Sequence, residues 1–120
     1  MVKDLLSMNI QDGDYLHDGD KIIEFNKSSF TCVNGNFAPL TSVMTPIKLN
    51  DCVLNACGYV KTNSTTFTHQ NGLPIITLDL SLRYIILGKI VDYLHELQQE
   101  CRKNNYTLSV DIYALSKCVI

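Results

Sequence analysis

Short stretches that alternate apolar and polar residues fill the first third of the chain, a pattern typical of short antiparallel strands. We expect four strands here, at residues 14–17, 20–25, 29–33 and 36–40. The turn sequences between them are Asp18-Gly19, Asn26-Lys27-Ser28 and Asn34-Gly35. Asp-Gly and Asn-Gly tolerate the positive φ angles of two-residue hairpin turns. Turns at this close spacing predict a small, barrel-like antiparallel meander, with Val43 and Met44 covering an open end.

A short helix with a clear start signal is predicted next. Asn50 can accept a backbone hydrogen bond as the N-cap residue, and Asp51 favours the positive end of the helix dipole. Leu49 and Leu54 stand at the two positions of a hydrophobic staple. We expect Gly58 to end this helix after about two turns.

The middle of the chain predicts a second group of strands. Residues 59–61 lead into a polar loop at residues 62–66. Asn71-Gly72 then joins a strand at 66–70 to a strand at 73–80, in which alternation makes one face more apolar than the other. A third strand is expected at residues 83–87.

The clearest periodicity predicts an amphipathic helix over residues 90–103. Its apolar stripe consists of Ile90, Leu94, Leu97 and Cys101. Residues 106–113 alternate again and predict a final strand, with a tail at 116–120. The sequence therefore predicts a single α+β domain over residues 1–120: an antiparallel β-meander, a short helix, a β-hairpin sheet, a longer C-terminal helix and a final strand.

Charged residues are scarce and evenly spread. Only 18% of the residues are charged and the formal net charge is −2, while ten Asn, nine Thr and eight Ser supply neutral polar groups. No stripe of basic residues of the kind that binds phosphate backbones is present, so nucleic-acid binding is disfavoured. No apolar run is long enough to span a membrane. A neutral polar surface of this kind favours recognition by shape and hydrogen bonds.

The chain contains five cysteines: Cys32, Cys52, Cys57, Cys101 and Cys118. Their number is odd, no C-x-x-C spacing occurs, and residues 1–8 hold too short an apolar segment for a secretory signal. We therefore expect a reduced, cytoplasmic protein. Cys52 and Cys57 are expected to be buried small hydrophobic residues.

No arrangement of catalytic or metal-binding residues stands out. Four aspartates lie close together, at Asp12, Asp14, Asp18 and Asp20. They do not fit the EF-hand loop, because the required glycine and final glutamate are missing, and we interpret them as residues of turns and strand edges. The three histidines, His17, His69 and His95, have no spacing that favours a shared metal ion. Because G-x-S-x-G and phosphate-binding glycine motifs are also absent, the sequence favours a non-enzymatic protein without metal or cofactor.

One edge of the predicted C-terminal helix is the candidate binding surface. His95 lies outside the apolar stripe beside Gln98 and Arg102, and Tyr93 lies on the other flank. An imidazole, an amide and a guanidinium on a partly exposed edge can make polar contacts with a ligand or a partner. The alternative is a solvated face on which His95 bonds Gln98 or Gln99 one turn on.

Several segments resemble those of small uncharacterised proteins of Bacteroidetes and their phages. The similar pieces are Ile10, Gly13, Asp14 and Leu16 for the family's opening L-x-x-G-N-x-V; Pro46-Ile47-Lys48-Leu49-Asn50, Leu54 and Gly58-Tyr59 for P-I-x-L-T … L … G-F; and Tyr93-Leu94-His95-Glu96-Leu97-Gln98 for Y-V-H-Q-L-Q. They occur in the family's order between residues 10 and 108. Residues 111–120 extend past the family's usual end, and we expect this extension to contact a second protomer.

The family carries no established activity, so the resemblance implies origin rather than mechanism. Small phage proteins without catalytic motifs are most often binders. We therefore expect a non-enzymatic binding protein of phage or mobile-element type that antagonises host defence by sequestering a small signalling ligand or blocking a host protein. We expect it to be a homo-oligomer, because residues 111–120 are expected to contact a second protomer. The alternatives are an assembly module of a virion or larger complex, and a small β-barrel that stacks nucleic-acid bases on Tyr15, Phe25, Phe30 and Phe37.

Overall fold

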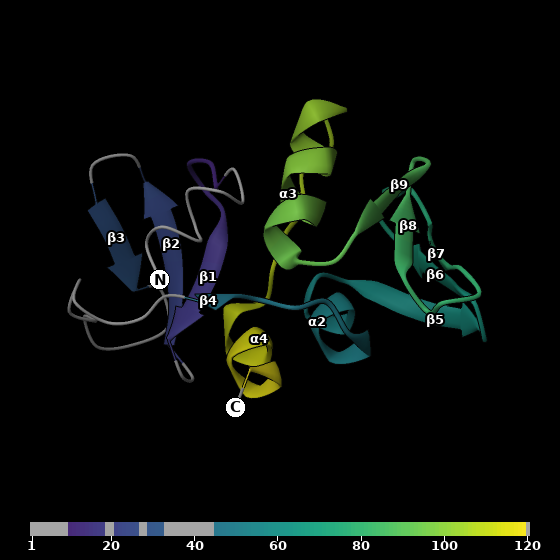
Figure 1. Cartoon of the computed structure of the whole chain (residues 1–120), viewed down its shortest axis with the longest axis horizontal. Coiled ribbons are helices and arrows are strands. Elements are labelled where there is room, and N and C mark those ends of the chain that lie inside the picture. Colours follow the sequence, from purple (N-terminus) through teal and green to yellow (C-terminus); the bar gives the residue numbers. More distant parts are fainter. Residues whose placement is uncertain (1–9, 19–20, 27–28, 33–44, 120) are drawn as a thin grey trace.

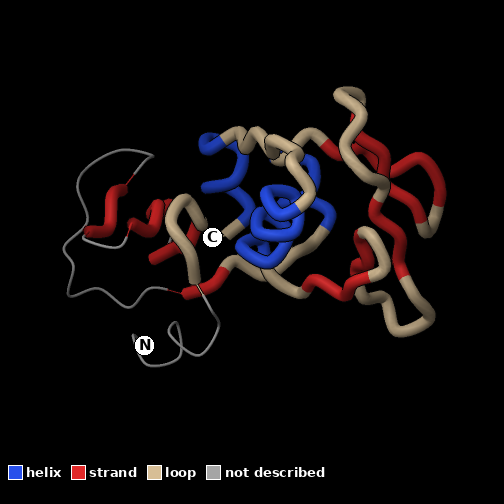
Figure 2. The backbone as a smooth tube through the Cα atoms, turned by 90° about the horizontal axis from the view of Figure 1, so that it is seen from above, coloured by secondary structure: helices blue, strands red, loops and turns tan. Residues whose placement is uncertain are grey.

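The computed structural model describes residues 10–18, 21–26, 29–32 and 45–119. Within these residues the fold is α+β, as expected, with an antiparallel sheet at each end of the molecule and three helices between the sheets (Figure 1). The view at right angles shows the same arrangement, with strands at both ends and helices in the middle (Figure 2). The molecule is elongated, with principal extents of 41 × 27 × 26 Å. No helix in the described ranges is long and apolar enough to cross a membrane.

The first sheet contains β1 (Tyr15–Asp18), β2 (Lys21–Asn26), β3 (Ser29–Cys32) and β4 (Thr45–Pro46), in the order β3-β2-β1-β4. All neighbours are antiparallel, which confirms the expected meander over its first three strands. Asp18 pairs with Lys21 and therefore lies on β1 rather than in the predicted Asp18-Gly19 turn, while Gly19 lies outside the described residues.

The described strands of the first sheet do not close into a barrel, so the barrel-like expectation is wrong for this part of the chain. β4 pairs with β1 over only two residues, and β3 and β4 remain the two edges of an open sheet. Other predicted features lie outside the described residues: the turn at Asn34-Gly35, the strand at 36–40, and Val43 and Met44.

Helix α2 (Asp51–Ala56) begins where the sequence predicts. The side chain of Asn50 accepts a hydrogen bond from the backbone N of Val53 at 2.8 Å, as an N-cap residue should. Gly58 follows the helix with a φ of +91°, and a Cβ atom at this position would lie 2.6 Å from Nε2 of His69. Both the backbone conformation and the neighbouring imidazole therefore require glycine here.

The second sheet has five antiparallel strands in chain order: β5 (Tyr59–Asn63), β6 (Thr66–His69), β7 (Ile76–Leu78), β8 (Tyr84–Ile86) and β9 (Lys89–Val91). Pairing of β6 with β7 confirms the predicted hairpin, and β8 is the predicted third strand. β5 continues to Asn63, through the start of the stretch that was predicted to be a loop.

Strand β9 replaces the predicted first turn of the long helix. Leu87 and Gly88 have φ angles of 51° and 79°, which form a tight turn that leads β8 back into β9. Helix α3 (Leu94–Lys103) therefore begins four residues later than expected. The predicted apolar stripe is buried except for Ile90, which lies on β9 with 46% of its surface exposed.

The predicted final strand is wrong, because residues 106–111 pair with no described strand and are followed by helix α4 (Ile112–Cys118). Asp111 caps this helix by accepting a hydrogen bond from the backbone N of Ala114 at 3.1 Å. Its own backbone N donates to the carbonyl oxygen of Ala56 at 2.8 Å, and Leu115 is buried in the core. The C-terminal extension therefore packs against α2 of the same chain.

A disulfide joins Cys52 on α2 to Cys118 on α4, with the two Cα atoms 5.7 Å apart. This crosslink contradicts two expectations, that the cysteines are all reduced and that Cys52 is a buried small hydrophobic residue. Cys57 is buried and free, as predicted, and so is Cys101. The partners of the disulfide are 66 residues apart, which no local spacing could reveal.

One cluster of buried side chains runs through the middle of the molecule. It contains Ile22 of the first sheet, the apolar side chains of α2 and α3, Leu115 of α4, and the inward side chains of the second sheet. Helix α3 contacts both β1 and β9 (Figure 1). Polar side chains of α3 that lie beside the core therefore meet the backbone of the first sheet.

Candidate functional site

Gln98, one of the four predicted binding residues, is buried between α3 and the first sheet. Only 7% of its surface is exposed. Its Oε1 accepts a hydrogen bond from the backbone N of Tyr15 at 2.9 Å, and its Nε2 donates to the carbonyl oxygen of Gly13 at 3.0 Å. The expectation of a partly exposed amide is wrong, because the backbone beside β1 presents a donor and an acceptor that the amide satisfies. Gln98 thus docks α3 on β1.

A buried carboxylate lies beside this contact. Asp14 is completely buried and accepts hydrogen bonds from the backbone N of Gln11 at 2.8 Å and from Nε2 of Gln99 at 2.7 Å. It also forms an ion pair with Arg102, whose Nη1 donates to the carbonyl oxygen of Asp12 at 2.7 Å. Since a buried charge is costly unless it is paired and hydrogen-bonded, these donors make the buried position tolerable. Arg102 therefore has a structural role, although 41% of its side chain remains exposed.

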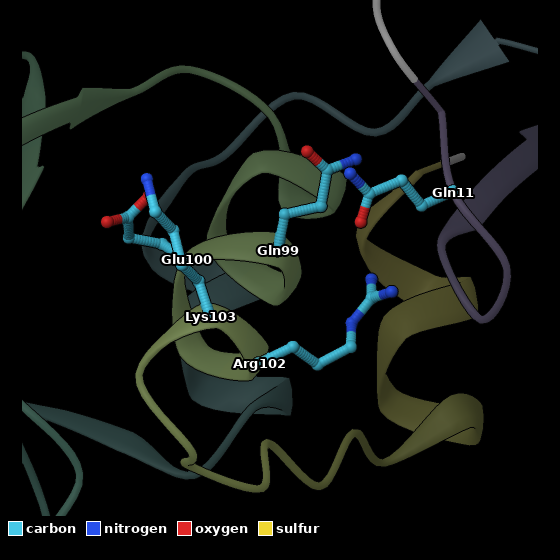
Figure 3. Close-up of a pocket in the computed structure, with 5 residues that line it drawn as sticks. All are labelled: Gln11, Gln99, Glu100, Arg102 and Lys103. Carbon is cyan, nitrogen blue, oxygen red and sulfur yellow. The ribbon is translucent and has the colours of Figure 1, made fainter.

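A surface hollow of about 540 Å³ lies next to Arg102 and is lined by Gln11, Gln99, Glu100, Arg102 and Lys103. Figure 3 shows the amide ends of Gln11 and Gln99 and the guanidinium of Arg102 turned toward one another, with Glu100 and Lys103 on the other side of the helix. Two further hollows, of about 260 Å³ and 290 Å³, also reach Arg102. Amide and guanidinium groups can donate hydrogen bonds to an anion, but they supply neither a nucleophile nor a general base.

Tyr93 and His95, the other two predicted residues, lie at the start of α3. Tyr93 is the N-cap residue, and its backbone N donates to the carboxylate of Glu96 at 3.0 Å. The rings of Tyr93 and His95 stack with their centroids 5.7 Å apart and their planes 16° apart. His95 is only 1% exposed, so the expected exposed imidazole is wrong. The four predicted residues do not form one surface: Gln98 and Arg102 contact residues 12–15, whereas Tyr93 and His95 stack on each other.

The two free cysteines among the described side chains, Cys57 and Cys101, and the imidazole of His69 are unsuited to catalysis. Burial, followed by the nearby Cys101, raises the pKa of the Cys57 thiol to about 12, and burial, followed by Glu100, raises the pKa of the Cys101 thiol to about 11. The thiolate is the nucleophile, so these thiols stay unreactive. His69 donates from Nε2 to the carbonyl oxygen of Cys57 at 2.9 Å and accepts at Nδ1 from the backbone N of Asn71 at 3.1 Å. Among the described residues, no group of three or more His, Cys, Asp or Glu could hold a metal ion.

The outward side of the second sheet carries a surface that the sequence did not predict. Five of its residues alternate with buried strand positions: Val60, Thr68, Thr77, Ile85 and Ile90. The strand register pairs Val60 with Thr68, Thr77 with Ile85, and Ile85 with Ile90. We call these five residues the outer sheet face. Val60 is 61% exposed and Ile90 46%, and none of the five carries a charge. The opposite side of the sheet packs into the core with the helices.

Comparison of the chain with protein-family models, with curated proteins and with solved structures finds no match. The structure alone therefore supplies the candidate binding sites. They are the outer sheet face and the hollow beside Arg102.

Proposed function

We propose that this chain is a non-enzymatic binding protein that blocks a protein partner through its outer sheet face. The observation that carries the proposal is the exposure of Val60 and Ile90 on the outer sheet face, none of whose five residues carries a charge. Apolar side chains gain free energy by leaving water, and the centres of protein interfaces are depleted of charged residues. The resemblance to small phage proteins supports a host protein as the partner, and antagonism of host defence as the consequence.

The dimensions of this face favour a protein over a small molecule. Neighbouring strands lie about 4.8 Å apart, so the two edge strands that carry Val60 and Ile90 are separated by at most about 19 Å. Small ligands prefer enclosed clefts, whereas a standard protein interface buries roughly 800 Å² on each partner. A broad, neutral sheet face is suited to contacts of the second kind.

The test is co-purification from the cells in which the tagged full chain is expressed, with captured proteins quantified by mass spectrometry. Wild type is compared with Ile90→Lys and with Tyr113→Lys. Both positions expose a large apolar side chain, 46% and 71% exposed, but Tyr113 lies on α4. We expect one protein to be enriched by wild type and Tyr113→Lys, and at least about tenfold less by Ile90→Lys. Equal enrichment by all three chains, or none by wild type, contradicts the proposal.

The hollow beside Arg102 favours a second candidate function, the sequestration of a small anionic ligand. The amides of Gln11 and Gln99 and the guanidinium of Arg102 converge there (Figure 3), and Lys103 also lines the hollow. Native mass spectrometry of the purified chain tests this function. A retained small molecule that is lost in Lys103→Ala supports it, whereas the same mass for wild type with and without mild denaturation counts against it.

Nucleic-acid binding has less support than either of these functions. Tyr15 and Phe25 are only partly exposed, and Tyr15 packs against the core. The side chains of Phe30 and Phe37 lie outside the described part of the structure. Binding to single-stranded DNA or RNA at low salt that is lost in Tyr15→Ala would favour this role. The remaining alternative, an assembly module, is tested by the same co-purification, in which virion proteins would be captured.

A further inference from the structure

The disulfide between Cys52 and Cys118 lies at the surface of the molecule. Cys52 is exposed on the first turn of α2, and Cys118 is partly buried as the last residue of α4. Thiol–disulfide exchange begins when a thiolate attacks one of the two sulfur atoms, so access to each sulfur decides where the exchange starts. Cys52 is therefore the half of the crosslink that a dissolved thiol reaches more easily.

The free cysteines Cys57 and Cys101 are not suited to this exchange. Both are buried, and burial raises the pKa of the Cys57 thiol to about 12 and that of the Cys101 thiol to about 11. A buried, protonated thiol is a poor nucleophile. Among the described cysteine side chains, reaction with a dissolved thiol is therefore confined to the crosslinked pair.

Helix α4 has a weak hold on the rest of the chain apart from this crosslink. Its seven residues are too few for a helix that is stable by itself. Of these seven side chains only that of Leu115 is buried, and Tyr113 is 71% exposed. At the start of the helix, the backbone N of Asp111 donates to the carbonyl oxygen of Ala56 at 2.8 Å. The disulfide fixes the other end of the helix, where the chain leaves the core.

The position of α4 decides which apolar side chains meet solvent. The helix contacts α2 and β2, and Figure 1 shows it between the first sheet and α2. Buried apolar residues of these two elements include Val53, Leu54 and Ile22. A helix that left this position would expose its own Leu115 and part of the apolar surface beneath it. The crosslinked and the opened chain would therefore present different surfaces.

We propose that the Cys52–Cys118 disulfide is a reversible switch, operated by a low-molecular-weight thiol, and that its reduction releases α4 from α2. The exposure of Cys52 supplies the point of attack, and the weak hold of α4 supplies the response. This inference does not rest on the proposed function, because the outer sheet face lies on the side of the second sheet away from the helices.

The exchange proceeds in two steps. The thiolate of the reductant attacks Sγ of Cys52, the bond between the two protein sulfurs breaks, and Cys118 leaves as a thiolate that takes a proton from water. A second thiolate attacks the reductant sulfur now bound to Cys52, and Cys52 leaves and is protonated in the same way. Two reductant molecules end joined as a disulfide, having given two electrons to the protein. Sγ of Cys118 lies 3.3 Å from the carbonyl oxygen of Ala114, an acceptor for the new thiol.

Hydrogen–deuterium exchange of the full chain, with and without millimolar reduced glutathione, tests the release of the helix. Alkylation with iodoacetamide followed by peptide mapping identifies the cysteines that have become thiols, and far-UV circular dichroism confirms that each sample is folded. Cys118→Ser is the matched control, because this variant cannot form the crosslink and reports any effect of glutathione elsewhere in the chain.

We expect glutathione to open the disulfide in the folded chain, so that Cys52 and Cys118 are alkylated while Cys57 and Cys101 are not. The backbone amides of α4 should then exchange at least about tenfold faster, while those of α3 change by less than about twofold. Oxidised glutathione should restore slow exchange in wild type. In Cys118→Ser the amides of α4 should exchange fast whether or not glutathione is present.

Three results would overturn the proposal. A disulfide that resists glutathione until the chain is denatured would be a permanent structural crosslink. Reduction that leaves the exchange of α4 unchanged would show that packing alone holds the helix. Faster exchange in α3 as well as in α4 would show that the crosslink stabilises the whole fold rather than one helix. Each of these results leaves the proposed function of the outer sheet face untouched.

Discussion

Replacing Gln98 by glutamate changes one atom of the contact that docks α3 on β1. The side chain keeps its shape, and Oε1 can still accept a hydrogen bond from the backbone N of Tyr15. The atom that donates to the carbonyl oxygen of Gly13 at 3.0 Å becomes a carboxylate oxygen. Two acceptors then face each other at a position that is only 7% exposed.

The expected cost follows from the groups that lose their partners. A buried carbonyl oxygen without its donor costs about 1–3 kcal/mol, and a buried charge facing it adds a comparable amount. We expect the free energy of unfolding at pH 7 to fall by about 3–5 kcal/mol, a large part of the roughly 5–15 kcal/mol that stabilises a typical protein.

The effect of this substitution should depend on pH. Burial and the facing carbonyl raise the pKa of the introduced carboxyl above its unfolded value of about 4.3. The loss of stability is then complete above the raised pKa, decreases as the pH falls through it, and vanishes below about pH 4, where the protonated carboxyl can donate to Gly13.

Urea unfolding followed by circular dichroism at pH 7 and at pH 4.5 measures both effects. Gln70→Glu makes the same chemical change at an exposed position and serves as the control, for which we expect a change below about 0.5 kcal/mol. A loss of less than about 1 kcal/mol for Gln98→Glu at pH 7 would refute the inference that this amide docks the helix.

Three further outcomes follow from the structure. Gly58→Ala should cost about 2–3 kcal/mol in a thermal melt, because a Cβ atom at φ +91° is strained and displaces the imidazole of His69; an unchanged melting temperature would contradict this. Burial raises the pKa of Cys57 to about 12 and that of Cys101 to about 11 from their ordinary value of 9.0, so the stability they contribute is complete below about pH 9 and is lost as the pH rises through those values. Urea unfolding should show about 2–3 kcal/mol less stability at pH 10 than at pH 8, and equal values would count against burial of the thiols. Cys52→Ser removes a disulfide that spans 66 residues and should lower the free energy of unfolding by about 4 kcal/mol by the chain-entropy relation. Dithiothreitol should lower the stability of wild type by a similar amount, and insensitivity of wild type to the reductant would exclude the crosslink.

Local signals predicted the parts of the fold that depend on neighbouring residues. Asn50 was recognised as an N-cap because the bond to Val53 joins residues three apart. The same holds for the antiparallel pairing of β1 with β2, which are close neighbours in the sequence. These elements need no information from the rest of the chain.

Elements whose identity depends on distant contacts were predicted incorrectly. Ile90 is a local exception: it fits the apolar stripe of a helix as well as it fits a strand, and the missed tight turn at Leu87 and Gly88 pairs it with Ile85 on β8. Residues 106–113 alternate as a strand would, but a strand needs a neighbour, and the cap at Asp111 directs the chain into α4 instead. Cys52 and Cys118 meet only because α2 and α4 pack together.

The candidate site shows the same limit. Periodicity placed Gln98 and His95 outside the apolar stripe of α3, but it could not show that both side chains are buried, Gln98 against the first sheet. The outer sheet face could not be predicted for a related reason. Threonine and isoleucine alternate in buried and exposed strands alike, so only the position of the helices on the opposite side of the second sheet shows that Ile90 is exposed.

Native mass spectrometry of the tagged chain purified from its expressing cells measures whether the outer sheet face binds a protein. We expect a complex of the chain with one partner protein, present for wild type and Tyr113→Lys and lost for Ile90→Lys. A chain that carries only a small molecule, or a protein complex that persists unchanged in Ile90→Lys, would contradict the claim that the outer sheet face binds a protein.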